Sequence, residues 1–239
     1  MSLIVPAVLP ASRKDLEEKL ALFARIPAVS RVQIDIVDGK FAGSASWPYT
    51  ASQELRDMVD SGAMLPHLDR LAYEIDLMCL DAERMAEAWL ALGATRLTFH
   101  AESATDLGRL LSSARRRYGA GDGFVPELIS FGVAINLASD LKLIEPCLNE
   151  VEYVQFMGIA RIGRQGQPFD RRVFEKIKAF HAKHPEIVLQ VDGGVSLQNA
   201  GRLRALGASD LVVGSALLNA RDFASVFAAF EEQQSPYGV

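Results

Sequence analysis

Two short stretches towards the C-terminal end combine small residues with groups that can do chemistry. The first, Val191-Asp192-Gly193-Gly194, is an apolar run that ends in a carboxylate and two glycines, and the second, Val213-Gly214-Ser215, ends in a glycine and a hydroxyl. Glycine lets backbone N–H groups approach an anion closely, and the last two strands of a (β/α)8 barrel end in this way where their loops hold a phosphate. The two stretches therefore predict a site for a phosphorylated small molecule with an acid/base carboxylate beside it.

The elements that must position these residues follow a regular alternation along the chain. Short apolar runs predict strands near residues 3–9, 31–37, 72–78, 95–100, 129–136, 151–158, 187–192 and 210–214. Amphipathic segments predict helices near residues 13–25, 50–59, 81–92, 104–118, 138–145, 170–183, 196–206 and 221–232. This α/β alternation favours a parallel sheet closed into a (β/α)8 TIM barrel. No composition shift divides the chain, so we expect one domain over residues 1–239.

An open, doubly wound sheet is the rival fold. Such a sheet usually has a Gly-rich turn after its first strand. The segment Val5-Pro6-Ala7-Val8-Leu9-Pro10 contains no glycine. The barrel is therefore the favoured architecture.

Side-chain alternation places polar residues inside the predicted barrel. Ile34 and Ile36 share one parity and should face the helices, so Gln33 and Asp35 face inward. The same argument directs inward the residues Glu74, Asp76, Met78, Gln155, Met157, Gln190 and Asp192. Buried carboxylates and amides are costly unless they are paired or bind something. We interpret Glu74, Gln155 and Gln190 as hydrogen-bonded core residues, and assign function to the three aspartates at strand ends, Asp35, Asp76 and Asp192.

The composition is typical of a globular protein. The chain has 239 residues, of which 49% are hydrophobic, and a net charge of −5. No basic face stands out, which disfavours nucleic acid as a partner, and no apolar stretch is long enough to span a membrane. We expect a soluble cytoplasmic protein with Cys79 and Cys147 as reduced core residues. Whether it forms a homo-oligomer is left open.

Several motifs follow one another in the order of a known family. Val32-Gln33-Ile34-Asp35-Ile36-Val37-Asp38-Gly39-Lys40-Phe41 resembles the signature H-x-D-x-M-D-G-x-F. The other matches, to D-x-H-L-M, T-x-H-x-E, G-V-A-L-N and the two phosphate loops, are Glu74–Met78, Thr98–Glu102, Gly132–Asn136, Val191–Val195 and Val213–Ala216. Together these motifs resemble the ribulose-phosphate 3-epimerase family.

The resemblance implies a barrel of the ribulose-phosphate-binding type and an isomerase that moves a proton at C3 of a ketose phosphate. Asp35 and Asp192 occupy the family's two acid/base positions, one on each face of an ene-diolate. The expected substrate-binding residues are Ala7, Gln33, Asp76, Met78, Met157, Gly163, Gly166, Gly193, Gly194, Gly214 and Ser215.

The chain departs from the family at its metal site and in its loops. Gln33 and Asp76 stand where the family has the two histidines that hold a divalent cation with the two aspartates. Ala7 replaces a serine of the first strand that touches substrate. The family's V-P-N and N-P-G-F-G-G-Q loops are replaced by Ala42–Ser44 and Ala160–Gln167, and the second replacement carries Arg161 and Arg164.

Three interpretations of these departures remain. Gln33, Asp35, Asp76 and Asp192 form an all-oxygen set, in which the three aspartates are the expected ligands of a weakly bound Mg²⁺ or Mn²⁺ rather than Zn²⁺. The site can also work without a metal, with a protonated Asp76 as hydrogen-bond donor. The third interpretation is a non-catalytic sugar-phosphate-binding protein that kept the phosphate loops. A decarboxylase with the motif D-x-K-x-x-D is disfavoured, because Met78 stands at the lysine position.

Overall fold

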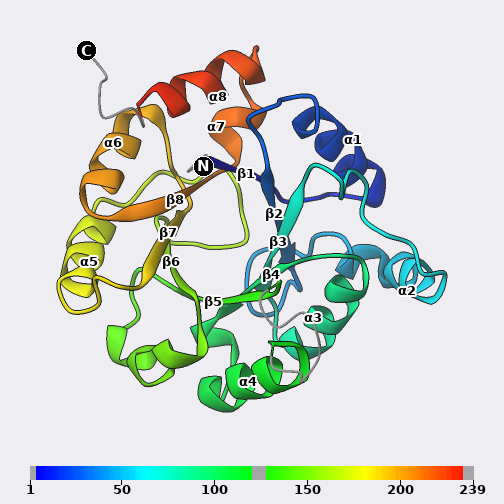
Figure 1. The fold of residues 1–239 in the computed structure, drawn as a ribbon, viewed down its shortest axis with the longest axis horizontal. Coiled ribbons are helices and arrows are strands. Elements are labelled where there is room, and N and C mark those ends of the chain that lie inside the picture. Colours follow the sequence, from blue (N-terminus) through cyan, green and yellow to red (C-terminus); the bar gives the residue numbers. More distant parts are fainter. Residues whose placement is uncertain (1–3, 120–127, 234–239) are drawn as a thin grey trace.

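The predicted barrel is present. In the computed structural model, which describes residues 4–119 and 128–233, parallel strands β1 to β8 close in sequence order into a barrel, and helices surround it (Figure 1). The strands are β1 (Ile4–Val8), β2 (Arg31–Val37), β3 (Ala72–Met78), β4 (Arg96–His100), β5 (Ser130–Ile135), β6 (Tyr153–Met157), β7 (Val188–Asp192) and β8 (Ala208–Val213). The helices are α1 (Arg13–Phe23), α2 (Ser52–Asp60), α3 (Ala82–Ala91), α4 (Leu107–Ala114), α5 (Arg172–His181), α6 (Leu197–Ala205), α7 (Ser215–Leu218) and α8 (Phe223–Glu232).

Two of the predicted helices differ from the structure. The helix expected near residues 138–145 is replaced by two 3-10 turns, Leu141–Leu143 and Glu145–Glu150. The backbone bonds of this segment reach three residues back, from Leu143 N to Asp140 O at 3.1 Å and from Ile144 N to Leu141 O at 3.0 Å, and Asp140 accepts from Lys142 N at its start. The helix expected near residues 104–118 ends as an α-helix at Ala114 and continues as a single π turn. The beginning of the first predicted strand, at residue 3, lies outside the described residues.

The main hydrophobic core lies between the barrel and its helices. Outward-facing side chains of neighbouring strands, such as Ile34 and Ile75, are fully buried against the helix layer. Several helices begin with a side chain that accepts a backbone N–H, as Ser12 does for α1 and Asp222 for α8. Cys79 and Cys147 are buried free thiols, as predicted. The apolar face of each strand thus fixes which residues are left to point inward.

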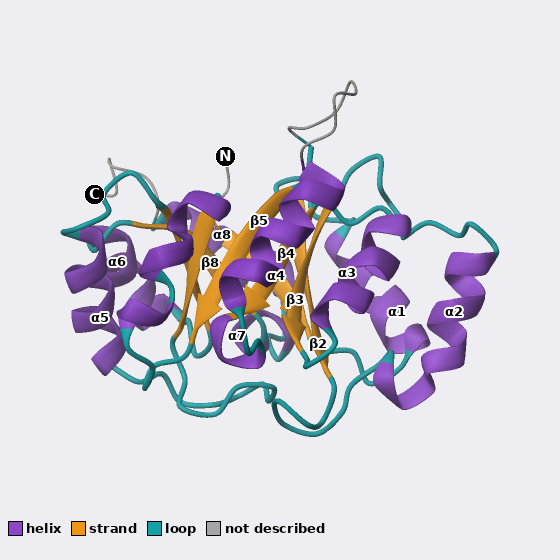
Figure 2. Ribbon diagram, turned by 90° about the horizontal axis from the view of Figure 1, so that it is seen from below, coloured by secondary structure: helices purple, strands orange, loops and turns teal. Residues whose placement is uncertain are grey.

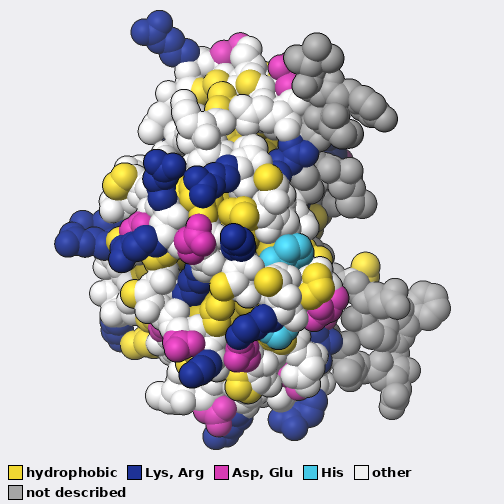
Figure 3. Space-filling view, turned by 90° about the vertical axis from the view of Figure 1, so that its left-hand side faces the viewer, with side chains coloured by type: hydrophobic (Ala, Val, Ile, Leu, Met, Phe, Trp, Pro, Cys, Tyr) yellow, Lys and Arg dark blue, Asp and Glu magenta, His cyan; other side chains and the backbone are white. Residues whose placement is uncertain are grey.

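The loops that follow the strands gather at one end of the barrel, the lower end in Figure 2. This is the end at which active sites lie in barrel enzymes. On the face formed by α5 and α6, lysine and arginine side chains are interspersed with acidic and apolar ones (Figure 3). No helix in the described part of the chain is long and apolar enough to cross a membrane.

Candidate functional site

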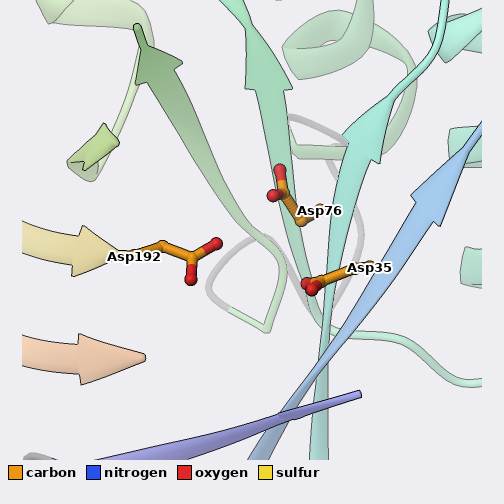
Figure 4. Close-up of side chains that lie close together, drawn as sticks. All are labelled: Asp35, Asp76 and Asp192. Atoms are coloured by element: carbon orange, nitrogen blue, oxygen red, sulfur yellow. The ribbon is translucent and has the colours of Figure 1, made fainter. Parts of the chain in front are cut away.

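Three buried carboxylates meet at the loop end of the barrel. Asp35, Asp76 and Asp192 project from β2, β3 and β7 towards one another (Figure 4), and one oxygen from each lies within 4.8 Å of the others. Strand register explains the meeting, because the Cα of Asp35 pairs with that of Asp76 in the β2–β3 ladder. Only Asp35 and Asp192 are slightly accessible, with 7% and 8% of their surface exposed, while Asp76 is fully buried. The sequence prediction that these residues converge is confirmed.

The loop after β2 is fixed by the aspartate of the D-G motif. One oxygen of Asp38 accepts from the backbone N–H of Lys40 at 2.7 Å and of Phe41 at 2.8 Å, and the other accepts from that of Leu80 at 2.9 Å. Gly39 adopts a φ of +74°, which an L side chain rarely allows. Asp38 is therefore a structural residue that ties the end of β2 to the end of β3, beside the carboxylates.

Amide and imidazole groups surround the three carboxylates. Gln33 Nε2 donates to Asp35 Oδ1 at 2.8 Å and to Asp192 Oδ2 at 3.1 Å. His100 Nε2 lies 3.0 Å from Asp76 Oδ1, and Gln155 Nε2 donates to Asp76 Oδ2 at 3.3 Å. Each aspartate is thus held by at least one side chain from another position of the barrel interior.

Burial shifts the protonation equilibria of the site. Burial, followed by the charge of Asp76, raises the pKa of Asp192 to about 7, although the Gln33 hydrogen bond lowers it. Burial and the neighbouring Asp192 raise the pKa of Asp35 well above its ordinary value. Burial lowers the pKa of His100, but the charge and hydrogen bond of Asp76 outweigh that effect and raise it. A carboxyl with a pKa near neutrality can both take and return a proton at physiological pH.

A pocket opens above the carboxylates. It is lined by most of the residues that the sequence assigned to substrate: Ala7, Asp35, Met78, Met157, Gly163, Gly166, Asp192, Gly193, Gly194, Gly214 and Ser215. Gln33 and Asp76 are fully buried and do not line the pocket; they support its floor. Their predicted role as direct substrate ligands therefore has no geometric support: Gln33 lies one inward position below Asp35 on β2, and His100 and Gln155 hold the carboxylate of Asp76 inside the barrel.

The glycine loops after β7 and β8 form one wall of the pocket. Gly194 has a φ of +68°, and a Cβ there would lie 2.7 Å from the Cα of Phe169, so only glycine fits. Gly214 faces the side chain of Gln165, whose Nε2 lies 2.8 Å from the position that a Cβ would occupy. Ser215 follows at once and begins α7. The wall exposes backbone and hydroxyl groups in place of bulky side chains, which suits an anion.

The loop between β6 and α5 covers the pocket. Gly163 packs against Gly43 of the loop after β2, where a Cβ would come within 2.4 Å of the Gly163 carbonyl. Gln165 Nε2 donates to the carbonyl of Ala7 in β1 at 3.4 Å. Arg161 and Arg164 are both exposed, but only Arg164 lines the pocket. The loop between β6 and α5 thus contacts both β1 and the loop after β2 across the mouth of the pocket.

Comparison with known proteins assigns the family. The chain matches the ribulose-phosphate 3 epimerase family over residues 3–218. It belongs to this family. It is 25% identical to the ribulose-phosphate 3-epimerase of Escherichia coli K12 over 228 residues, which cover 94% of this chain and 92% of that protein. It is 26% identical to the chloroplastic ribulose-5-phosphate-3-epimerase of Arabidopsis thaliana over 243 residues, covering 99% and 79%.

Solved structures support the fold. The KGPDC of Streptococcus mutans, in a complex with a sugar phosphate, superimposes with a TM-score of 0.68 at 14% identity, covering 96% of this chain and 95% of that one. At this identity the likeness concerns the barrel alone. The family match and its curated relatives support an epimerase-like sugar-phosphate enzyme, and the closed barrel agrees with that family.

The donor set fits a metal ion only in part. Three clustered carboxylates can hold a cation and suit Mg²⁺ or Mn²⁺ by type. Zn²⁺ and iron sites favour nitrogen ligands, and Gln33 and Asp76 stand where the family motifs have histidine. Gln33 does not add the oxygen ligand expected from the sequence, because its Nε2 N–H groups are directed at Asp35 and Asp192 and its carbonyl accepts from Gln190. The residues present do not fit a tightly held zinc or iron.

Sequence reasoning missed two parts of this site. His100 ends β4 within the motif Thr98–Glu102, and its Nε2 contact with the fully buried Asp76 makes it part of the cluster. Its position at a strand end was the available signal. Arg164, to which the motifs assign no definite role, lines the pocket because the loop folds back over the barrel. No periodicity in the sequence indicates how such a loop folds.

Proposed function

We propose that the protein is an epimerase that inverts C3 of a ketose phosphate by proton transfer between two aspartates. The observation that carries the proposal is the pairing of Asp35 and Asp192, which project from different strands into one pocket floor and both have raised pKa values. Two acids are the minimum equipment for inversion, since one must remove a proton and another must return it on the opposite face.

The mechanism follows from the positions of the groups. The phosphate binds between Gly193-Gly194 and Gly214-Ser215, which directs the sugar chain towards the carboxylates. One aspartate removes the C3 proton as the C3–H electrons move into a C2–C3 double bond and the C2 carbonyl oxygen becomes an oxyanion. The other aspartate, protonated at the start, then delivers its proton to the opposite face of C3, and the carbonyl re-forms.

The walls of the pocket serve this reaction in different ways. Met78 and Met157 provide an apolar surface against the sugar chain. The cover formed by the loop between β6 and α5 keeps bulk water from the ene-diolate, which water would otherwise protonate at C3 without regard to face. When bound, a cation would supply charge stabilisation to the oxygens of the ene-diolate. We expect any such cation to be weakly held Mg²⁺ or Mn²⁺ on Asp35, Asp76 and Asp192.

The substrate is a small phosphorylated ketose, and the chain acts as one domain in a soluble, cytoplasmic protein. The sugar-phosphate complex of the S. mutans barrel supports a ligand of this class for the fold. The alternative is a protein that binds the sugar phosphate without turning it over. The loss of the family's two histidines is the observation that favours this alternative.

The two functions differ in one measurable event. The protein, incubated in D₂O with a panel of ketose phosphates, should incorporate deuterium at C3 of its substrate and interconvert the epimers. Parallel reactions contain Mg²⁺, Mn²⁺ or a chelator. Binding of the sugar phosphate by calorimetry without any C3 exchange, under all of these conditions, would establish the non-catalytic alternative.

A further inference from the structure

The polar residues inside the barrel form a series of hydrogen bonds that starts at the end opposite the pocket. Glu74 is fully buried, and Arg96 Nε donates to its Oε2 at 3.0 Å. Arg31 approaches the same oxygen at 3.9 Å, and Thr98 donates to the other oxygen at 3.1 Å. A carboxylate paired with guanidinium groups offers only lone pairs, so any further partner of Glu74 must be a donor.

Gln190 is that donor, and this contact fixes the orientation of its amide. Its Nε2 donates to Glu74 Oε1, to Gln155 Oε1 at 2.7 Å and to Gln33 Oε1 at 3.2 Å, so its two hydrogens are shared among three acceptors. Gln190 Oε1 is buried and has no hydrogen-bond partner among the described residues. The opposite orientation would direct a carbonyl oxygen at the Glu74 carboxylate. The contact with Glu74 therefore decides that the NH₂ group of the Gln190 amide, and not its carbonyl oxygen, faces Glu74, Gln155 and Gln33.

The orientation of the Gln190 amide determines that of the Gln33 and Gln155 amides. Gln33 and Gln155 both use their carbonyl oxygen to accept from Gln190, so both direct their N–H groups away from it. Gln33 Nε2 then donates to Asp35 and Asp192, and Gln155 Nε2 donates to Asp76. The ion pair of Arg96 with Glu74 at one end of the barrel thus fixes which group donates in each of the following hydrogen bonds. At the other end, all three aspartates accept from amide N–H groups.

A cation at the aspartates would need the reverse orientation. If it took the place of the Gln33 N–H groups, it would compete with them for Asp35 Oδ1 and Asp192 Oδ2. If Gln33 turned its carbonyl to the cation, its N–H₂ would face the N–H₂ of Gln190 and leave buried donors opposed. The direction of the hydrogen bonds inside the barrel therefore disfavours binding of a metal ion beside Gln33.

We propose that Gln33 is a positioning residue that bridges Asp35 and Asp192 in place of a metal ion, its amide oriented by the chain Arg96–Glu74–Gln190. The exclusion of metal rests on hydrogen-bond direction alone. Only the description of Asp35 and Asp192 as the acid/base pair rests on the proposed function.

A Mn²⁺ titration of the metal-free protein, followed by calorimetry and by electron paramagnetic resonance, tests the exclusion. We expect wild-type protein to bind Mn²⁺ weakly. Gln33→Met keeps the approximate shape but removes the donor. Gln190 donates to Gln33, Glu74 and Gln155 rather than to the aspartates, so Gln190→Met frees Gln33 to turn its carbonyl to the ion. Both should strengthen Mn²⁺ binding by about tenfold or more, the size of effect that groups behind a metal ligand have.

Thr98→Val is the matched control. It removes a buried hydrogen bond to Glu74, but Arg96 still pairs with that carboxylate, so Mn²⁺ affinity should stay at the wild-type level. Circular dichroism establishes that each variant is folded, and Gln190→Met decides the question if Gln33→Met does not fold. Tight Mn²⁺ binding by the wild type that Gln33→Met abolishes would overturn the proposal, because Gln33 would then be a ligand. Unchanged affinity in both glutamine variants would overturn it as well.

A pH profile separates positioning from a merely structural role. The Gln33 hydrogen bonds lower the pKa of both aspartates. Gln33→Met should therefore move the acidic limb of the C3 exchange rate to higher pH, whereas a structural defect would lower the rate and leave the limb in place, which would contradict the positioning role. If no protein exchanges C3 hydrogen, the proposed function fails, and the Mn²⁺ titration still decides the metal exclusion.

Discussion

At the scale of single residues, the site depends on carboxyl groups held away from water and close to one another. Asp192 is accessible over only 8% of its surface, and burial together with the charge of Asp76 raises its pKa to about 7. Enzymes commonly tune a carboxyl in this way to exchange protons near neutral pH. The same shift has a measurable consequence for stability.

Asp192→Asn should stabilise the protein at alkaline pH and have little effect at acidic pH. Because the native pKa of Asp192 lies above the value of about 3.9 for an unfolded aspartate, the native state binds the proton more tightly. The stability contributed by the protonated form is complete below about pH 4 and is lost as the pH rises through about 7. Asparagine keeps this contribution at all pH values, so the difference should grow across that window to at most about 4 kcal/mol.

Chemical unfolding of wild type and variant from pH 4 to pH 8.5 measures this difference. Asp60→Asn at an exposed position of α2 is measured in parallel and reports the effect of replacing an aspartate outside the buried cluster. A constant difference between wild type and Asp192→Asn across the range would show that Asp192 has no raised pKa.

At the scale of elements, the strands were predictable and the loops were not. Inward and outward faces follow from alternation, and the hydrogen bonds found for Glu74, Gln155 and Gln190 confirm their interpretation as paired core residues. The direction of those bonds could not be predicted, because it depends on contacts between strands far apart in the sequence. The helix expected near residues 138–145 was wrong because its backbone N–H groups bond three residues back, as Leu143 does to Asp140, and an amphipathic pattern does not separate this 3-10 spacing from an α-helix.

The loop between β6 and α5 carries a prediction of its own. Arg164 lines the pocket and forms no ion pair within the described ranges 4–119 and 128–233, so its charge is available to a ligand phosphate. Arg164→Gln should weaken binding of ribulose 5-phosphate about tenfold or more, the usual contribution of a charged hydrogen bond. Arg161→Gln, on the same loop but outside the pocket, should leave the affinity unchanged.

Calorimetry with ribulose 5-phosphate and with unphosphorylated ribulose completes the test. The phosphate should account for most of the affinity, and Arg164→Gln should not alter binding of the unphosphorylated sugar. Equal binding of the two sugars by the wild type would show that the pocket has no phosphate-binding site. An equal loss in both arginine variants would assign the effect to the general charge of the loop.

At the scale of the whole molecule, family membership predicts the fold, whereas the chemistry of the site depends on the residues of this particular chain. The family match spans residues 3–218, and the closed barrel agrees with it. The motifs therefore predicted the fold and the meeting of Asp35, Asp76 and Asp192. They did not predict a site held together by amides, because Gln33 stands at a position where the family signature has histidine.

The central claim is that Asp35 and Asp192 divide the two proton transfers between them, and epimer-specific C3 exchange in D₂O tests it most directly. Asp35→Asn and Asp192→Asn should each slow epimerisation by about 10²–10⁴-fold, the usual contribution of general acid–base catalysis. Each variant should also lose C3 exchange from one epimer of the substrate while retaining it from the other, and the retained epimer should differ between the two. Near-normal epimerisation in either variant, or loss of exchange from the same epimer in both, would contradict the assignment of the two aspartates to opposite faces of the substrate.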